Sequence, residues 1–405
     1  MSRLEELIQQ YCPDGVEFVR FVDYANVLYG YPFDAAQFTS DNSYIPLIRI
    51  RDVLSGKAGT YYTGEYSKDY IIKKGDILVG MDGNFNLGIW DDIDGLLCQR
   101  VCKLYTKDET RLLNGFIRHY MKPVFRKIEE STPGGSVKHL SAKAINSIQI
   151  PLPPLPVQEE IVRILDNFAE LQAELQAELQ KRLQQYNYYR DNLLSFEGRT
   201  DVEWKKLGEL GVFYGGLSGK TKEDFKDGNA KFISYKNVFY NLSLNIDTDE
   251  RVKIVEGEKQ NTIQYGDILF TGSSETPDEC GMSSVLTQKT DDKLYLNSFC
   301  FGYRLHNPSL FCLDFLKHLF RSSELRKQIG KTASGTTRFN VSKKRFAEVS
   351  IPVPPLSVQK QIADILDKFY TLTTDITAGL PAEIEARRKQ YEYYRDQLLT
   401  FEKKA

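Results

Sequence analysis

The chain has 405 residues, which is enough for two or three domains with sizeable cores. Its formal net charge of -2 gives no support for nucleic-acid binding by itself and does not exclude it, because local basic patches matter more than the total. We expect neither a signal peptide nor a transmembrane helix, because no stretch is apolar enough. The six cysteines form no Cys-x-x-Cys pair, so reduced thiols in a cytoplasmic protein are favoured over a structural zinc site.

The first predicted element is a short amphipathic helix within residues 1–12. Its apolar face is formed by Leu4, Leu7, Ile8 and Tyr11. A helix this short needs a partner surface to be stable. Residues 13–150 then form a predicted globular domain with strands, turns and one helix near 114–129. Its strand-like runs are 44–50, 70–72, 76–79 and 95–104.

Residues 151–197 predict one long helix. No Gly or Pro interrupts the sequence from Val157 to Phe196, and leucine recurs at every fourth position from Leu171 to Leu183. About 40 residues at ~1.5 Å each give a helix roughly 60 Å long, far longer than is usual within one compact domain. We therefore expect this helix to reach between two parts of the molecule. Its polar side of Gln, Glu, Lys and Arg suits water.

Residues 198–350 and 351–405 repeat the plan of a globular domain followed by a long helix. IPLPPLPVQ begins at Ile150 and IPVPPLSVQ begins at Ile351, with seven of nine positions identical. QYNYYRDNLLSF begins at Gln185 and QYEYYRDQLLTF at Gln390, with nine of twelve identical. A period of about 200 residues is too long for a solenoid, so the chain is an internal duplication with pseudo-two-fold character. Gly379-Leu380-Pro381 predicts a break in the second helix.

The duplication reads as circular. Val16-Glu17-Phe18 follows the short first helix, and the similar Val202-Glu203-Trp204 follows the first long helix. Residues 1–11 therefore stand where the end of a long helix stands in the other copy. We expect them to pack beside the distal end of a long helix, with the two chain termini close together.

The two globular domains share landmarks and diverge between them. A Gly-Asp-Ile-Leu segment begins at Gly75 in the first domain and at Gly266 in the second. In the same alignment, His318 corresponds to His119. Paired scaffolds with different inner surfaces suit the recognition of two different targets.

Catalytic motifs are weak. Gly216 to Thr221 resembles the end of a phosphate-binding loop, but Tyr214 stands where that motif needs glycine, so a polar turn is the better interpretation. Asp278, Asp291 and Lys293 loosely fit the acidic-lysine pattern of nucleases, in which carboxylates gather around a cation. That pattern is short and absent from the first domain, and it leaves a single-chain metal-dependent nuclease as an alternative. No catalytic residue and no metal site is predicted.

Two basic segments are more informative. Residues 317–345 carry nine Lys or Arg and one acid, and residues 111–143 carry seven Lys or Arg and two acids. Each combines a helix with a small-residue turn, which suits contact with phosphates and base edges, although a solvated helix face is the other interpretation. The candidate DNA-binding residues are Arg49, Arg51, Asn84, Gly134, Gly135, Lys138, His139, Lys236, Asn237, Ser273, Ser274, Thr336, Thr337, Arg338 and Asn340.

The tyrosine clusters at the helix ends have two interpretations. Tyr186 and Tyr189, like Tyr391 and Tyr394, are three residues apart and share one helical face. That face either packs against the companion helix or forms a docking surface for a partner protein.

Taken together, these segments resemble the specificity (S) subunit of type I restriction-modification systems over essentially the full chain. The resemblance is carried by PLPPLPVQEEIVRILDNF, PVPPLSVQKQIADILDKF, the QYxYYRDxLL helix ends, YGYPF, YIPLIRIRDV, KKGDILVGMDGNFN, LLCQRVCKL, YGGLSGKT and YGDILFTG. Members often have Thr-Pro after the Gly pair, where this chain has Leu217-Ser218.

The resemblance implies an α+β chain with two target-recognition domains, 13–150 and 198–350. Two long antiparallel helices would separate them as a coiled coil and act as a ruler. Each domain would grip one half of a split double-stranded DNA sequence, whose bases and spacer length the sequence does not give.

The same resemblance implies a non-catalytic subunit that works in a complex. Two methylation (M) subunits would bring adenine methylation with S-adenosylmethionine, and two restriction (R) subunits would bring cleavage with ATP and Mg. No cofactor is expected in this chain. Besides the nuclease, a non-enzymatic protein scaffold is the remaining alternative.

Overall fold

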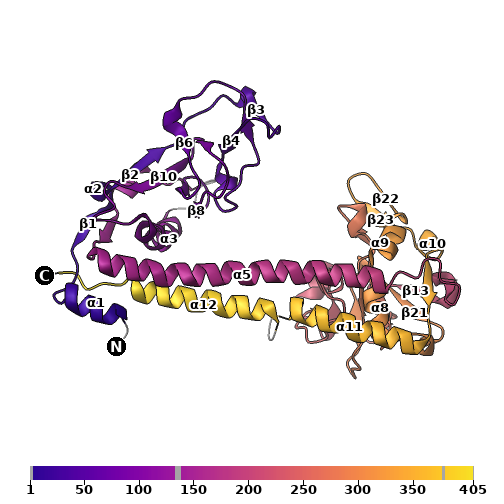
Figure 1. The fold of residues 1–405 in the computed structure, drawn as a ribbon. Coiled ribbons are helices and arrows are strands. Elements are labelled where there is room, and N and C mark those ends of the chain that lie inside the picture. Colours follow the sequence, from indigo (N-terminus) through magenta and orange to yellow (C-terminus); the bar gives the residue numbers. More distant parts are fainter. Residues whose placement is uncertain (1–2, 133–137, 376–378, 405) are drawn as a thin grey trace. The chain divides into compact units, whose positions relative to one another are not determined.

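The computed structural model describes residues 3–132, 138–375 and 379–404 (Figure 1). The chain divides into two compact units, and each is described by itself below. Unit 1 consists of Met1–Glu174 and Ile384–Ala405, and unit 2 consists of Leu175–Glu383. The longest helix, α5 (Leu155–Leu193), has 39 residues, as the leucine periodicity predicted. The predicted break in the second long helix is also present, because α11 (Leu356–Thr374) and α12 (Leu380–Leu398) are separate helices.

Unit 1 contains two larger sheets and one two-stranded sheet, together with several helices. The further helices are α1 (Arg3–Tyr11), α2 (Phe21–Tyr24), α3 (Asn114–Ser131) and α4 (Ala142–Asn146). The strands are β1 (Phe18–Arg20), β2 (Ala25–Tyr29), β3 (Phe38–Thr39), β4 (Ile45–Ile48), β5 (Tyr61–Tyr62), β6 (Ile71–Ile72), β7 (Ile77–Gly80), β8 (Leu87–Ile89), β9 (Gly95–Leu97), β10 (Val101–Thr106) and β11 (Gln149–Pro151). The inner sheet has the order β2-β10-β7-β8 and the outer sheet the order β3-β5-β4-β9-β6, while β1 pairs with β11.

Unit 2 repeats this plan. Its further helices are α6 (Leu207–Leu210), α7 (Tyr235–Tyr240), α8 (Leu313–Leu319), α9 (Ser323–Gly330) and α10 (Lys343–Phe346). The strands are β12 (Glu203–Lys206), β13 (Gly211–Gly215), β14 (Ala230–Ile233), β15 (Arg251–Val252), β16 (Thr262–Ile263), β17 (Ile268–Thr271), β18 (Ser273–Ser274), β19 (Ser283–Val285), β20 (Leu294–Leu296), β21 (Cys300–Leu305), β22 (Ala333–Ser334), β23 (Phe339–Val341) and β24 (Ser350–Val353).

The sheet topology confirms the internal duplication and the predicted α+β class. The inner sheet of unit 2, β13-β21-β17-β19, has the same connectivity as β2-β10-β7-β8 in unit 1. The outer sheet of unit 2 has the order β15-β14-β20-β16. Each outer sheet contains one parallel pair, β4 with β9 and β14 with β20. In one place the sequence prediction was wrong, because the run 95–104 is two strands in different sheets. The backbone turns sharply between β9 and β10, where Arg100 has a φ of 71°.

The Pro-Pro and Val-Gln segments recur at the start of each long helix, and the structure explains why. The side chain of Gln158 is buried and accepts a hydrogen bond from the backbone N–H of Leu113 at 3.0 Å. Its amide donates to the backbone oxygens of Arg111 and Pro153 at 2.8 and 2.7 Å. Because buried polar groups must be hydrogen-bonded, this glutamine holds the domain against the helix.

Gln359 makes the equivalent contacts in unit 2. It accepts from Cys312 N at 2.8 Å and donates to the oxygens of Leu310 and Pro354 at 3.0 and 2.8 Å. The same three backbone groups are therefore satisfied in both units, which explains why the motif occurs twice.

A Tyr–His–Asp cluster with a buried tyrosine and a buried histidine also occurs once in each unit. In unit 1, His119 lies 2.6 Å from an Asp166 carboxylate oxygen and 3.2 Å from the Tyr391 hydroxyl. Burial, with the nearby cations Arg118, Lys122 and Arg395, lowers the pKa of His119 below its ordinary value.

In unit 2, His318 lies 2.6 Å from Asp367 and 3.0 Å from the Tyr186 hydroxyl. Burial lowers the pKa of His318 as well, although Asp367 opposes the shift. Each tyrosine comes from the long helix of the other sequence repeat, so the two copies are connected in a circle.

The chain termini confirm the circular arrangement. Leu4 of α1 is buried in the same core cluster as Tyr391 and Leu399 of the C-terminal region. Val16 N donates to Glu402 O at 2.8 Å, and Lys404 N donates to Val16 O at 3.0 Å. The short first helix therefore packs beside the distal end of a long helix, as predicted.

The paired helices run antiparallel where they meet within each unit. In unit 1, Tyr394 of α12 stacks on Phe168 of α5 with ring centroids 5.4 Å apart, while Arg388 and Gln172 line one pocket further along. In unit 2, Tyr189 of α5 stacks on Phe369 of α11 at 5.2 Å. These contacts confirm the interpretation that the tyrosine face packs against the companion helix. Tyr186 and Tyr391 are buried, so their predicted role in docking a partner is corrected to an interior one.

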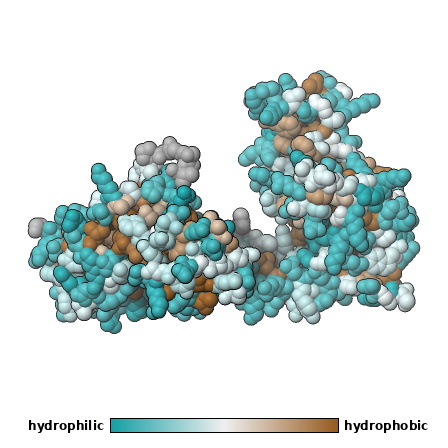
Figure 2. Space-filling model, turned by 90° about the horizontal axis from the view of Figure 1, so that it is seen from above, coloured by the Kyte–Doolittle hydropathy of each residue, from teal (hydrophilic) through white to brown (hydrophobic). Residues whose placement is uncertain are grey.

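Hydrophilic residues cover most of the face seen in Figure 2. Within the part of the chain that the structure describes, no helix has the length and apolarity needed to cross a bilayer.

Candidate nucleic-acid interface

In unit 1, loops from distant parts of the sequence are tied together by backbone hydrogen bonds. We call this set the loop frame of unit 1, and it comprises 49–52, 81–84, 98–100 and 138–140. Cys98 N donates to Ile48 O at 3.2 Å, and Met81 N donates to Arg100 O at 2.8 Å. Leu140 N then donates to Met81 O at 2.7 Å. The loops therefore form one fixed surface at the ends of β4, β7 and β9.

Unit 2 has the same frame, formed by residues 234–237, 272–274, 297–299 and 338–341. Asn297 N donates to Ile233 O at 3.0 Å, Gly272 N to Phe299 O at 2.7 Å, and Val341 N to Gly272 O at 2.9 Å. These bonds define the equivalent positions of the two units. Lys236 corresponds to Arg51, Ser273 to Asp82, Phe299 to Arg100, and Asn340 to His139.

One glycine in each unit permits this close packing. A Cβ on Gly30 would lie 2.0 Å from the carbonyl oxygen of Cys98, and a Cβ on Gly216 would lie 2.1 Å from that of Asn297. These partners are backbone atoms that cannot move aside, so any side chain is excluded. This accounts for the glycine of YGYPF and the second glycine of YGGLSGKT.

Asp82 is the centre of the polar side chains in the unit 1 frame. One of its oxygens lies 2.5 Å from His139 Nδ1, and the other lies 3.2 Å from Arg100 Nε. Arg100 is the one non-glycine residue with a positive φ among the residues that the structure describes. Such strained backbone often marks a functional position, because the surrounding structure must hold it in place.

An open pocket of about 560 Å³ lies on this frame. It is lined by Phe33, Ala35, Phe38, Arg49, Ile50, Arg51, Cys98, Gln99 and Arg100. The Arg49 guanidinium lies 5.8 Å from the centroid of the Phe38 ring, and Arg51 donates to the Thr60 hydroxyl at 2.6 Å. The surface thus combines an apolar floor with cations at its rim, which suits contact with bases and phosphates together.

The unit 2 frame carries a pocket of about 510 Å³ with more aromatic walls. It is lined by Tyr235, Lys236, Phe239, Tyr240, Ser273, Ser274, Glu275, Glu279, Thr337 and Arg338. Arg338 Nε donates to the Ser273 hydroxyl at 3.3 Å, and its guanidinium lies 5.5 Å from the Phe299 ring centroid. Phe299 is 56% exposed at the tip of its turn.

The structure brings many of the predicted residues together. In unit 1, Arg49 and Arg51 line the pocket. His139 pairs with Asp82, which also pairs with the pocket residue Arg100. In unit 2 the frame and its pocket contain Lys236, Ser273, Ser274, Thr337, Arg338 and Asn340. Thr336 is exposed in the turn that precedes them. Gly134 and Gly135 lie outside the described residues.

Several predicted residues have structural roles instead. Lys138 donates to the backbone oxygen of Glu129 at 2.5 Å and so satisfies the C-terminal end of α3. Asn237 bonds the backbone of Asn245 in both directions, at 2.7 and 3.1 Å. Because their polar atoms are used within the fold, the prediction that these two side chains contact DNA directly is corrected.

Three other predicted residues also differ from expectation. Ser273 and Ser274 are buried, and Ser274 donates to Glu279 at 2.9 Å, so both support the pocket wall. Asn84 lines a different pocket of about 650 Å³, which it shares with Lys122, Arg388 and other residues of unit 1.

Sequence reasoning missed Asp82, Gln99, Arg100 and Phe299. The available signal was the polar pair Gln99-Arg100, which interrupts the otherwise apolar run from Leu96 to Cys102. An interruption of this kind indicates a turn whose side chains face solvent.

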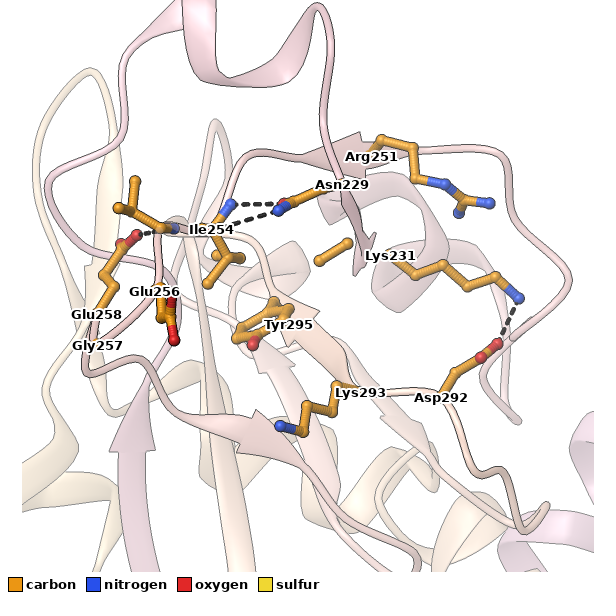
Figure 3. A pocket seen from close by; sticks show the side chains of 12 residues that line it. Asn229, Lys231, Arg251, Ile254, Glu256, Gly257, Glu258, Asp292, Lys293 and Tyr295 are labelled. Carbon is orange, nitrogen blue, oxygen red and sulfur yellow. Dashed lines mark hydrogen bonds and ion pairs between the residues drawn. The ribbon is translucent and has the colours of Figure 1, made fainter.

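The nuclease alternative has no geometric support. Asp292 and Lys293 line a pocket of about 690 Å³ in unit 2, in which Lys231 pairs with Asp292 at 2.6 Å (Figure 3). Asp278 and Asp291 do not line it. Across the described ranges, no three His, Cys, Asp or Glu side chains gather as metal ligands do.

A family model described as the type I restriction modification DNA specificity domain matches residues 13–185 and 200–386. The chain belongs to this family. It is 34% identical to the EcoR124I/EcoR124II specificity subunit of Escherichia coli over 84% of both chains. It is 29% identical to a putative type I restriction enzyme specificity subunit of Haemophilus influenzae, over 84% of this chain and 88% of the relative.

Solved structures agree on the fold. A chain from a structure titled for complex assembly and conformational transition of the type I R-M system has a TM-score of 0.58 at 18% identity, covering 96% of this chain and 98% of its own. The S subunit from M. genitalium has a TM-score of 0.50 at 16% identity, covering 95% of both chains. As a specificity subunit, the chain is the DNA-recognition component of a restriction-modification complex and is not itself catalytic.

Proposed function

We propose that each loop frame contacts one half of a bipartite DNA target. The observation that carries this proposal is the equivalence of the two frames. Their backbone hydrogen bonds coincide, while their exposed side chains differ at nearly every corresponding position. A constant frame with variable tips is what the recognition of two different sequences requires, because side chains at base edges determine specificity.

The partners and cofactors follow as part of the same proposal. Two M subunits bind this chain and methylate adenine with S-adenosylmethionine, and two R subunits add cleavage with ATP and Mg. The assembly acts in the cytoplasm. Family membership supports this assignment.

The experiment is to express the chain with its M partner and map methylated adenines in cellular DNA. We expect one motif with two fixed halves and a nonspecific spacer. DNA binding by the complex should weaken steeply with salt, because phosphate contacts release counterions. Cleavage by the purified chain with magnesium alone would favour the nuclease. A complex with the M partner that shows no salt-sensitive, sequence-selective DNA binding would favour the scaffold.

Arg338 and Lys138 sharpen this test as a matched pair of cations. If Arg338 contacts a phosphate, Arg338→Ala should weaken binding to all sequences and lower the salt slope by about one. If it reads a base, the cost should be ~1–3 kcal/mol at a single position. Lys138→Ala is the control, because its ammonium group bonds the Glu129 backbone. An equal DNA-binding defect in both variants would contradict the assignment.

The tandem LQAE units at Leu171–Glu174 and Leu175–Glu178 provide a test of the spacer. A third copy extends a helix by ~6 Å, which is one or two base pairs at ~3.4 Å each, and keeps the leucine spacing. We expect it to keep both half-sites and to lengthen the spacer, and deleting a copy should shorten it. A change in the half-site bases with the spacer intact would refute the ruler assignment.

A further inference from the structure

Arg100 stands apart from the other arginines on the unit 1 frame. It occupies the tip of the turn between β9 and β10, with a φ of 71°. Its backbone oxygen accepts from Met81 N at 2.8 Å, and Val101 N donates to Cys98 O at 3.3 Å, so the turn is closed on both sides. The strained conformation is therefore fixed by neighbours and aims one side chain outward from the frame.

The ion pair with Asp82 fixes the direction of that side chain. The contact is made by Nε, at 3.2 Å from Asp82 Oδ2, and no described residue accepts a hydrogen bond from the terminal guanidinium nitrogens. The Arg100 side chain is 65% exposed, whereas the Asp82 side chain is 16% exposed. His139 occupies the other Asp82 oxygen, which holds the carboxylate in place. A guanidinium held through Nε keeps its two terminal nitrogens, which bond none of the described residues, side by side as an oriented fork.

We propose that Arg100 reads a guanine in the half-site bound by unit 1, with Asp82 as its positioning residue. This inference rests on the proposed function of the loop frames. The O6 and N7 atoms of guanine are two acceptors side by side in the major groove, and an arginine fork matches both. Orientation by Asp82 reduces the side-chain freedom that binding would otherwise remove.

Unit 2 offers an internal contrast at the equivalent position. Phe299 has no hydrogen-bonding group, and it is 56% exposed beside the Arg338 guanidinium. It can make only an apolar contact, for which the C5-methyl group of thymine is the partner in the major groove. The contact made by Phe299 itself should therefore not depend on guanine N7.

The test uses the chain assembled with its M partner, with Arg100→Gly as the main variant. Glycine accepts a positive φ without strain, so the turn is preserved while the fork is lost. We expect discrimination at one guanine of the unit 1 half-site to fall about 5- to 150-fold, with the other half-site unchanged. Arg100→Lys keeps the charge without the fork, so its discrimination at this guanine should lie between that of Arg100→Gly and that of the parent. Asp82→Asn should relax the same position less strongly.

A modified base identifies the contact itself. Replacing that guanine by 7-deazaguanine removes the N7 acceptor, so it should weaken binding of the parent complex and leave Arg100→Gly unaffected. Arg163→Gln is the matched control, since Arg163 pairs with the mostly buried Glu160 on α5, outside the frame. It should keep the parent motif and the parent response to 7-deazaguanine.

The possible failures are distinguishable. If the parent complex methylates no bipartite motif, the proposed function itself fails. If the parent motif is present and Arg100→Gly recognises every guanine as before, the assignment of Arg100 is overturned and the function stands. Relaxation at an A·T pair, or in the second half-site, also overturns it. A thermal unfolding midpoint close to that of the parent complex confirms that the variants are folded.

Discussion

Unit 1 and unit 2 share their backbone hydrogen bonds and differ in the side chains that those bonds present. The same loops meet in both, and the same glycine is needed at Gly30 and Gly216. The side chains at equivalent positions of the two frames differ. Arg100 forms an ion pair with Asp82 in unit 1, whereas Phe299 lies beneath the guanidinium of Arg338 in unit 2. The comparison teaches that the frame and the specificity of this protein are separable, because the frame depends on backbone atoms and the specificity on exposed side chains.

The parts nearer the helices differ much less than the tips. The glutamine contacts and the Tyr–His–Asp clusters recur with the same atoms in both units. One variation is the cation beside the aspartate, which is Arg118 against Asp166 in unit 1 and Lys317 against Asp367 in unit 2. We infer that this region is held constant because both units must join to the helices in the same way.

The largest expected loss of stability comes from variants that remove the glutamine contacts of this constant region. Gln158→Leu or Gln359→Leu leaves one N–H and two carbonyl oxygens without a buried partner, at ~1–3 kcal/mol each. We expect each variant to lose at least ~3 kcal/mol in urea-induced unfolding, by a similar amount in the two units. Gln176→Leu is the control on an exposed position of α5 and should change stability by less than ~0.5 kcal/mol. A large loss in one unit with none in the other would show that the glutamines are not equivalent.

An intermediate effect concerns pH. The pKa values of His119 and His318 are lowered in the folded chain, so the unfolded chain binds more protons once the pH falls below ~6.5. Stability should therefore decrease on acidification from about pH 6.5, by ~1.4 kcal/mol for each unit by which a pKa is lowered. Aspartate protonation adds to the loss at lower pH, because the pKa of Asp367 is also lowered.

Histidine variants assign that acid sensitivity. His119→Gln and His318→Gln should each flatten the pH dependence of the free energy of unfolding between about pH 6.5 and 4.5, and the double variant should flatten it most. His139→Gln is the control on the exposed frame. An unchanged pH dependence in the double variant would contradict this assignment.

The smallest effect on stability concerns the exposed tyrosines of the helix ends. Tyr188 and Tyr393 are 66% and 62% exposed, and each lies edge-on to its neighbour at 5.5 Å. Tyr188→Ala and Tyr393→Ala should change the free energy of unfolding by less than ~0.5 kcal/mol. If these positions contact the M subunits, both variants should weaken assembly, measured by co-purification and titration. Normal assembly by the double variant would place that contact elsewhere.

The features that repeat along the chain could be predicted from the amino-acid sequence. The length of α5 follows from uninterrupted leucine spacing, and the separation of α11 from α12 follows from Gly379 and Pro381. The duplication and its circular order were predicted from sequence segments that occur twice in the chain. These features are local or periodic, so the residues that cause them are neighbours in the sequence.

Which polar side chains remain available on the loop frames depends on the folded structure and could not be predicted from the sequence. Lys138 and Asn237 look like DNA contacts in the sequence, yet Glu129 and Asn245 take up their polar atoms. Arg100 looks like part of a strand, yet it projects from a turn that Met81 closes through a backbone bond. The cause is the same in each case. The partner that commits or orients a side chain lies on another loop, and only the folded backbone brings that loop within hydrogen-bonding distance.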